Sequence, residues 1–179
     1  MRRPSYLILH GYQGSGPGHW QTWLAGRLRS SDASVYYPDL PDADAPRLDS
    51  WLEALEGELE SMAEPPVVIC HSAGCILWLH HVAEGGRPGE RVLLVAPPSR
   101  AGVPDILGSF FPVPEIEAPN ARIVCSDNDP YCPEGAATLF RGRVDLLPGL
   151  GHINPDAGYG DWPAVEAWAH DGAVPITAR

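Results

Sequence analysis

The chain has 179 residues, of which 44% are hydrophobic and 20% charged, and its formal net charge is -11. A chain of this size and composition buries enough apolar surface to fold without disulfides or metals, so we expect a single domain over residues 1–179. The excess of acidic side chains argues against a nucleic-acid partner, because affinity for nucleic acid comes mainly from Lys and Arg on phosphates.

Short apolar runs alternate with helix-like segments along the whole chain. The runs that predict strands are residues 6–9, 35–37, 67–70, 92–95, 123–125 and 144–147. Apolar residues at helical spacing predict helices near residues 20–28, 51–62, 76–79 and 136–140, and from about Asp161 through Trp168. This alternation is typical of βαβ units, and it predicts a three-layer α/β/α sandwich with a mainly parallel sheet of about six strands. In such a sheet, ligands bind beyond the carboxyl ends of the strands.

Ser72 stands between the buried strand 67–70 and a helix, and Gly74 follows two residues later. A nucleophile elbow needs this context, because its serine occupies a strained turn that leaves no room for large residues two positions away. Gly74 meets that requirement, while the small residue Cys70 stands at the other such position. The alternative is that Ser72 only caps the helix that follows. The strand before it and the helix after it favour the nucleophile.

A serine hydroxyl is a weak nucleophile and needs a base. Among the seven histidines, His152 follows the last predicted strand and precedes the final helix, which is where the base stands in the chain order Ser, acid, His. His80 and His81 lie more than a helical turn beyond Ser72, and His71 must point elsewhere, into a structural hydrogen bond. The alternative for His152 is an ordinary surface histidine on a loop.

The acid is expected between the serine and the histidine in the chain. Residues 126–130 follow the strand 123–125 and include two acids, Asp127 and Asp129. Either carboxylate could hold the imidazole in the required tautomer, and either could instead stabilise a turn before Pro130. Local chemistry does not choose between them.

The oxyanion hole needs two N–H donors. The amide of Ala73 is one, and the loop after the first strand supplies the other, with Tyr12 as the first choice and Gln13 as its competitor. Gly11 lets this backbone approach closely. The glycines of the loop have neither of the spacings used for phosphate binding, and no histidine pair has the spacing of a zinc motif. We therefore expect no cofactor and no metal.

The segment from Ala96 to Asn120 is the insertion long enough to cover the site. Its Phe110 and Phe111 are candidates for an apolar acyl pocket, and the alternative is that they fill the core. A short cover of this kind favours small esters or amides over long-chain lipids as substrates.

The four cysteines, Cys70, Cys75, Cys125 and Cys132, contain no Cys-x-x-Cys pair. They predict reduced, structural thiols in a cytoplasmic protein. Apolar strand-like residues begin almost directly after Met1, so no secretory signal is expected. No run approaches the roughly 20 apolar residues of a membrane span.

Residues 10–21 read HGYQGSGPGHWQ and resemble the signature HG-x-x-GS-x-x-x-HWQ of the small serine hydrolases of the retinoblastoma-binding protein 9 / YdeN type. The resemblance continues at residues 71–74, at the Asp129-Pro130 pair and at residues 151–152, so it spans nearly the whole chain in the same order. The departure is Cys70, which stands where relatives commonly have glycine.

The resemblance implies an α/β-hydrolase fold without a large cap domain and a serine hydrolase acting on esters or amides. It favours Asp129 over Asp127, because the acid of the family directly precedes the proline. No catalytic role follows for His19 and Trp20, which we interpret as structural, with Trp20 packing the first helix on the sheet and His19 or Ser15 bracing the oxyanion loop. The alternative function is a catalytically silent protein-interaction module on the same fold, since fold alone does not fix function.

Overall fold

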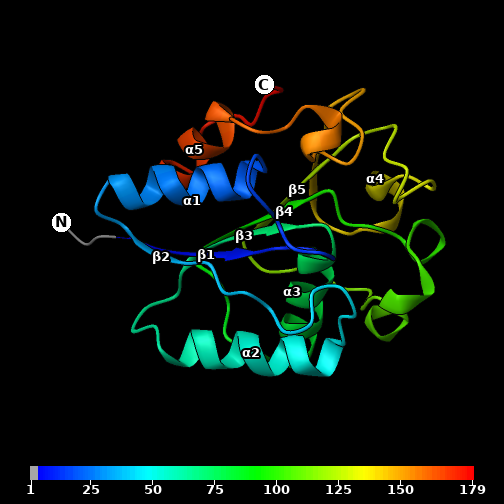
Figure 1. Ribbon diagram of the computed structural model, residues 1–179, viewed down its shortest axis with the longest axis horizontal. Helices are drawn as coiled ribbons and strands as arrows, with labels where there is room; N and C mark the ends of the chain where they lie inside the picture. The colour runs from blue at the N-terminus through cyan, green and yellow to red at the C-terminus, as the bar shows by residue number, and fades with distance from the viewer. Residues whose placement is uncertain (1–3) are drawn as a thin grey trace.

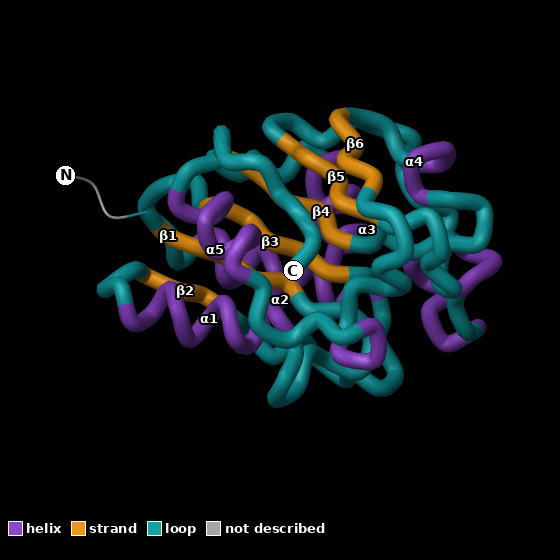
Figure 2. Tube along the Cα trace, turned by 90° about the horizontal axis from the view of Figure 1, so that it is seen from above, coloured by secondary structure: helices purple, strands orange, loops and turns teal. Residues whose placement is uncertain are grey.

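A single sheet crosses the part of the chain that the computed structural model describes, residues 4–179. Within these residues its strands are β1 (Ser5–Leu9), β2 (Ser34–Tyr36), β3 (Val67–His71), β4 (Arg91–Val95), β5 (Ala121–Cys125) and β6 (Arg143–Leu146). The order across the sheet is β2-β1-β3-β4-β5-β6, and every neighbouring pair is parallel. Figure 2 shows β2 and β6 at opposite edges. The mainly parallel sheet of about six strands is confirmed.

Helices cover both faces of this sheet (Figure 1). On one face lie α1 (Trp20–Ser30) and α5 (Pro163–His170), and on the other lie α2 (Leu48–Glu60) and α3 (Ala73–Ala83). The pleat of β1 sends alternate side chains to the two sides. Tyr6 and Ile8 join the core under α1 and α5, while Leu7 and Leu9 join the core over α2 and α3.

The central strand β3 is buried along its whole length, which explains why its sequence is continuously apolar. Its helix α3 begins at Ala73, earlier than the predicted apolar segment, and most of its residues are buried. The predicted helix at 136–140 shrinks to α4 (Ala136–Leu139), because Phe140 already has an extended backbone. None of the helices in residues 4–179 is long and apolar enough to span a bilayer.

The order of the strands fixes where a site can form. The chain runs from β1 outward to β2 and then returns to β3 on the other side of β1. A crevice opens at such a reversal, beyond the carboxyl ends of the two central strands. The residues that follow β1 and β3, His10 to Gly14 and Ser72, therefore meet at this point.

Candidate active site

Ser72 occupies a strained turn between β3 and α3, with φ 55° and ψ -125°. A positive φ is costly for a residue with a side chain and persists only where the surroundings hold it. The Ser72 amide donates to the Val95 carbonyl at 2.9 Å, which ties the turn to β4. A Cβ on Gly74 would lie 2.5 Å from the Leu9 carbonyl oxygen and 2.7 Å from that of His10. Only glycine lets the turn sit this close to β1.

Cys70 does not disturb this turn. Its side chain is fully buried in the core between the sheet and α3. Burial raises the pKa of its thiol well above the usual range, so the group stays neutral. All four cysteines are free and buried, as expected.

The structure brings the three sequence-predicted side chains together. His152 Nε2 lies 2.9 Å from Ser72 Oγ, and His152 Nδ1 lies 2.8 Å and 3.0 Å from the two carboxylate oxygens of Asp129. Ser72, Asp129 and His152 are 9%, 5% and 7% exposed, so water screens these contacts little. A neutral His152 with its proton on Nδ1 donates to Asp129 and accepts the hydroxyl proton of Ser72 at Nε2. This arrangement can activate the hydroxyl.

The two aspartates that the sequence left open lie in different places. Asp129 is buried against His152 and also accepts the Tyr131 amide at 2.8 Å. Asp127 is exposed and accepts the Gly149 amide at 2.8 Å. Its carboxylate therefore binds the loop that precedes His152.

Asp127 belongs to a latch between two loops that sequence reasoning missed. Ser126 Oγ accepts the Leu150 amide at 2.9 Å and Asn128 Oδ1 accepts the Gly151 amide at 2.7 Å. With the bond from Gly149 to Asp127, three successive side chains bind three successive amides. The latch fixes the backbone directly before His152.

The loop after β1 approaches the Ser72 turn closely. A Cβ on Gly11 would lie 2.8 Å from Ser72 Cβ. His10 Nε2 accepts the Leu40 amide at 2.9 Å, so the proton of a neutral His10 ring is on Nδ1, which donates to the Gly11 carbonyl at 2.8 Å. The Gly14 amide donates to the same carbonyl at 3.1 Å.

These bonds leave Tyr12, rather than Gln13, with a free amide. In a trans peptide the N–H points opposite the C=O, so the bonds to the Gly11 carbonyl direct the Tyr12 N–H to the other side of the peptide. The Gln13 amide instead donates to the Ala43 carbonyl at 2.8 Å. Within residues 4–179 the amides of Tyr12 and Ala73 donate no hydrogen bond, so both remain available to a ligand.

His71 and Trp20 hold the backbone around His152. The Nε2–H of His71 donates to the His152 carbonyl at 2.9 Å, and the indole N–H of Trp20 donates to the Ile153 carbonyl at 2.9 Å. The Ile153 backbone has a φ of 49°, which these bonds help to maintain. Burial, together with the neighbouring His152 and His19, holds the pKa of His71 well below the usual range. Its ring therefore acts as a neutral donor.

A family model described as serine hydrolase matches residues 6–170 of the chain. The chain belongs to the serine hydrolase family. YdeN of Bacillus subtilis (strain 168) is 26% identical to it over 171 residues, which are 88% of this chain and 90% of YdeN.

Solved structures show the fold of this serine hydrolase. The structure of B. subtilis YdeN matches with a TM-score of 0.71 and 22% identity over 92% of this chain and 95% of the other. A YdeN-like protein from Pectobacterium atrosepticum matches with a TM-score of 0.76 and 22% identity over 97% and 94%. A monoacylglycerol lipase from Paleococcus ferrophilus matches at 0.64 and 14% over 93% and 95%. The fold is that of a YdeN-type α/β hydrolase without a large cap domain.

A pocket of about 270 Å³ opens above Ser72. One wall is the loop after β1 with Tyr12, and the cover is formed by Val103, Pro104 and Leu107 from the segment 96–120. The ring of Tyr131 lies 4.4 Å from the ring of His152 at the pocket edge. Segment 96–120 therefore reaches the pocket of the serine hydrolase, as the sequence suggested, but through aliphatic side chains.

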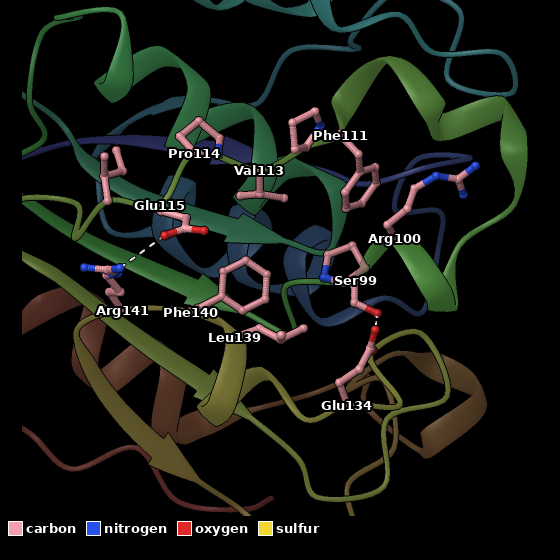
Figure 3. Close-up of a pocket in the computed structure, with 13 residues that line it drawn as sticks. Ser99, Arg100, Phe111, Val113, Pro114, Glu115, Glu134, Leu139, Phe140 and Arg141 are labelled. Atoms are coloured by element: carbon pink, nitrogen blue, oxygen red, sulfur yellow. Dashed lines mark hydrogen bonds and ion pairs between the residues drawn. The ribbon is translucent and has the colours of Figure 1, made fainter.

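Phe110 and Phe111 do not line this pocket, and that interpretation is corrected. Phe110 is fully buried, with its ring 5.1 Å from that of Trp51 on α2, because burying a whole aromatic ring in the core is strongly favourable. Phe111 lines a different pocket of about 300 Å³, together with Val113 and Phe140 (Figure 3). The hydrophobicity of a phenylalanine pair predicts burial, but it does not indicate whether the rings lie in the core or in a particular pocket.

Proposed function

We propose that the protein hydrolyses small esters or amides through an acyl-enzyme intermediate, with Ser72 as nucleophile, His152 as general base and Asp129 as the acid that orients it. The observation that carries the proposal is the continuous pair of contacts from Ser72 Oγ through His152 to the Asp129 carboxylate, at 2.9 Å and 2.8 Å. Membership of the serine hydrolase family supports it.

In the first step Ser72 Oγ attacks the carbonyl carbon while its proton passes to His152 Nε2. Collapse of the tetrahedral intermediate expels the alcohol or amine, which takes that proton from His152. Water then attacks the acyl-enzyme, gives its proton to His152, and the acid leaves as Ser72 regains its proton. Asp129 stabilises the imidazolium present in both halves.

The amides of Tyr12 and Ala73 are proposed to bind the oxyanion. Both are unpaired among residues 4–179, and Gly11 brings their loop against the Ser72 turn. A preorganised donor of this kind contributes roughly 3 kcal/mol to transition-state stabilisation.

Small substrates are favoured because the pocket holds about 270 Å³ and its cover comes from a short segment. The proposal includes both carboxylesterase-like and amidase-like activity.

We also propose a cytoplasmic location and a single domain. Four free, buried cysteines support the cytoplasmic location. The two hydrophobic cores on a shared sheet support one domain over residues 1–179.

A fluorophosphonate probe tests the nucleophile. We expect the wild-type protein to be labelled, Ser72→Ala to lose labelling, and Ser30→Ala to keep it, because the exposed Ser30 hydroxyl bonds only within its own helix α1. A panel of p-nitrophenyl esters of increasing chain length, with aminoacyl amides beside them, measures turnover. Labelling that persists in Ser72→Ala contradicts the assignment. Absence of both labelling and turnover favours the catalytically silent interaction module.

A further inference from the structure

His19 stands at the start of α1 and uses one ring nitrogen to cap it. Its Nδ1 accepts the Gln21 amide at 3.1 Å. An amide N–H can only donate, so Nδ1 presents its lone pair and the proton of the neutral ring is on Nε2. Burial, followed by the neighbouring His152 and His10, lowers the pKa of His19 to about 4. At neutral pH the ring is therefore an uncharged donor at Nε2.

This Nε2–H has no acceptor within residues 4–179, although only 5% of the His19 residue is exposed. Among these residues the fully buried side-chain donors without a partner are Trp78 Nε1 and Arg91 Nε, so the His19 Nε2 atom is accessible and a ligand oxygen can reach it. His19 also lines the pocket above Ser72, and its ring lies 4.8 Å from that of His71, which in turn lies 4.9 Å from that of His152. The unpaired donor thus belongs to the wall of the candidate active site.

The surroundings of His19 indicate what kind of acceptor would suit it. Asp156 is the only Asp, Glu, Lys or Arg among the residues that line this pocket, and the chain has a net charge of -11. An anionic group would be repelled by Asp156 and would find no cation among these lining residues. An uncharged oxygen acceptor suits both the neutral imidazole and the acidic rim.

We propose that His19 is a substrate-binding residue whose Nε2–H donates a hydrogen bond to an uncharged ether, hydroxyl or carbonyl oxygen of the ester or amide bound at Ser72. The inference rests on the proposed function, and it names a feature of the substrate. It also gives His19 a second task besides capping α1.

Two kinds of variant separate the tasks of His19. Asn and Ser are good N-cap residues, so His19→Asn and His19→Ser keep an acceptor for the Gln21 amide and remove the pocket donor. In His19→Gln the amide nitrogen lies near the position of Nε2, so this variant keeps a donor in the pocket and weakens the cap. Two cap-retaining variants keep the test open if one of them folds poorly.

Matched esters then report on the hydrogen bond. On the acyl side, p-nitrophenyl methoxyacetate is compared with p-nitrophenyl butyrate, and on the leaving-group side 2-methoxyethyl butyrate is compared with butyl butyrate. Each pair exchanges one ether oxygen for a methylene. The measured quantity is the ratio of kcat/KM for the ether ester to kcat/KM for its methylene partner. A general loss of activity in a variant affects both esters and cancels in this ratio. The difference in intrinsic reactivity between the two esters is the same for every variant, so it cancels when the ratios are compared.

We expect this ratio to fall about three- to tenfold in His19→Asn and His19→Ser for at least one pair, and to recover in His19→Gln, as for loss of one neutral hydrogen bond. Ratios equal to those of the wild type in both pairs overturn the inference. Fluorophosphonate labelling is measured in parallel. A wild type that is labelled and active but has unchanged ratios in the variants removes only the role of His19, whereas an unlabelled and inactive wild type removes the proposed function itself.

Discussion

Each polar side chain of the loop after β5 makes its own contact. Asp129 binds the ring of His152, while Ser126, Asp127 and Asn128 bind the amides of the loop before that ring. Asp129, which contacts His152, and the three latch residues, which fix the backbone before His152, are therefore consecutive in the sequence. Two carboxylates two positions apart have different surroundings, one buried and one exposed, and this difference predicts different consequences for the same substitution.

Asp129→Asn should lower kcat by about a thousandfold or more, because the amide cannot hold His152 in the tautomer that accepts the serine proton. Asp127→Asn should change kcat little, since an amide oxygen still accepts the Gly149 N–H. Steady-state kinetics on a short p-nitrophenyl ester, with fluorophosphonate labelling rates, measure both. Equal losses in the two variants would contradict the separation of roles.

At this scale the sequence predicts which loops carry the site, because Ser72, Asp129 and His152 each follow a strand. It does not choose between neighbours on one loop. Asp127 and Asp129 are distinguished by Gly149 and His152, and the Gln13 amide is occupied by Ala43. Each of these partners, Gly149, His152 and Ala43, lies more than twenty residues away in the chain. The residues next to the loop in the sequence therefore do not indicate the contact.

For the helices and strands, formation of the site depends on how closely α3 packs against β1 and β3. Gly74 lies in the first turn of α3, where the carbonyls of Leu9 and His10 leave no space for a Cβ. Helix propensity alone favours alanine over glycine inside a helix by up to about 1 kcal/mol. The backbone contact at 2.5 Å outweighs that preference, because neither carbonyl can move without shifting β1 or the loop that follows it.

Gly74→Ala should therefore destabilise the protein by about 1–3 kcal/mol, the usual effect of overpacking, and should slow fluorophosphonate labelling of Ser72. Gly57→Ala is the matched control. Gly57 is exposed within α2, and a Cβ there would meet no atom within 4 Å, so this change should stabilise by up to about 1 kcal/mol. Urea unfolding measures both, and a Gly74→Ala protein as stable and reactive as the wild type would refute the steric argument.

The elements themselves follow from the sequence as far as continuous apolar runs define them. All six predicted strands are present in residues 4–179, with bounds shifted by one or two residues. The short α4 and the position of Phe110 do not follow, because both depend on how segments pack. Phe110 fits between α2 and α3, where its carbonyl accepts a bond from His80 at 2.9 Å.

At the scale of the whole molecule, uncharged imidazoles surround the candidate site. His10, His19 and His71 are 4%, 5% and 4% exposed, and burial is the main cause that lowers the pKa of each. Each ring holds backbone through a nitrogen whose proton state is fixed: His10 binds the Leu40 amide, His19 caps α1, and His71 binds the His152 carbonyl. The site is therefore built on groups that charge readily once the chain unfolds.

This arrangement predicts that acid destabilises the protein at a mild pH. An unfolded histidine has a pKa of about 6.5, whereas the folded His19 has a pKa of about 4 and those of His10 and His71 are also lowered. Below about pH 6.5 the unfolded chain binds more protons than the folded one, so the free energy of unfolding falls as the pH decreases toward 4. Each histidine contributes up to about 1.4 kcal/mol per pH unit.

The variant His71→Gln isolates one proton of this effect, because its side-chain amide can still donate to the His152 carbonyl and does not titrate. Urea unfolding between pH 7 and pH 5 should give the wild type a falling free energy of unfolding, and His71→Gln a slope smaller by about 1 kcal/mol per pH unit on average. His170→Gln is the comparison for replacing a histidine as such, since His170 is exposed on α5. Identical slopes for His71→Gln and the wild type would mean that His71 does not stay neutral in the folded protein. A smaller slope would tie the stability of the molecule to the same neutral ring that holds His152 beside Ser72.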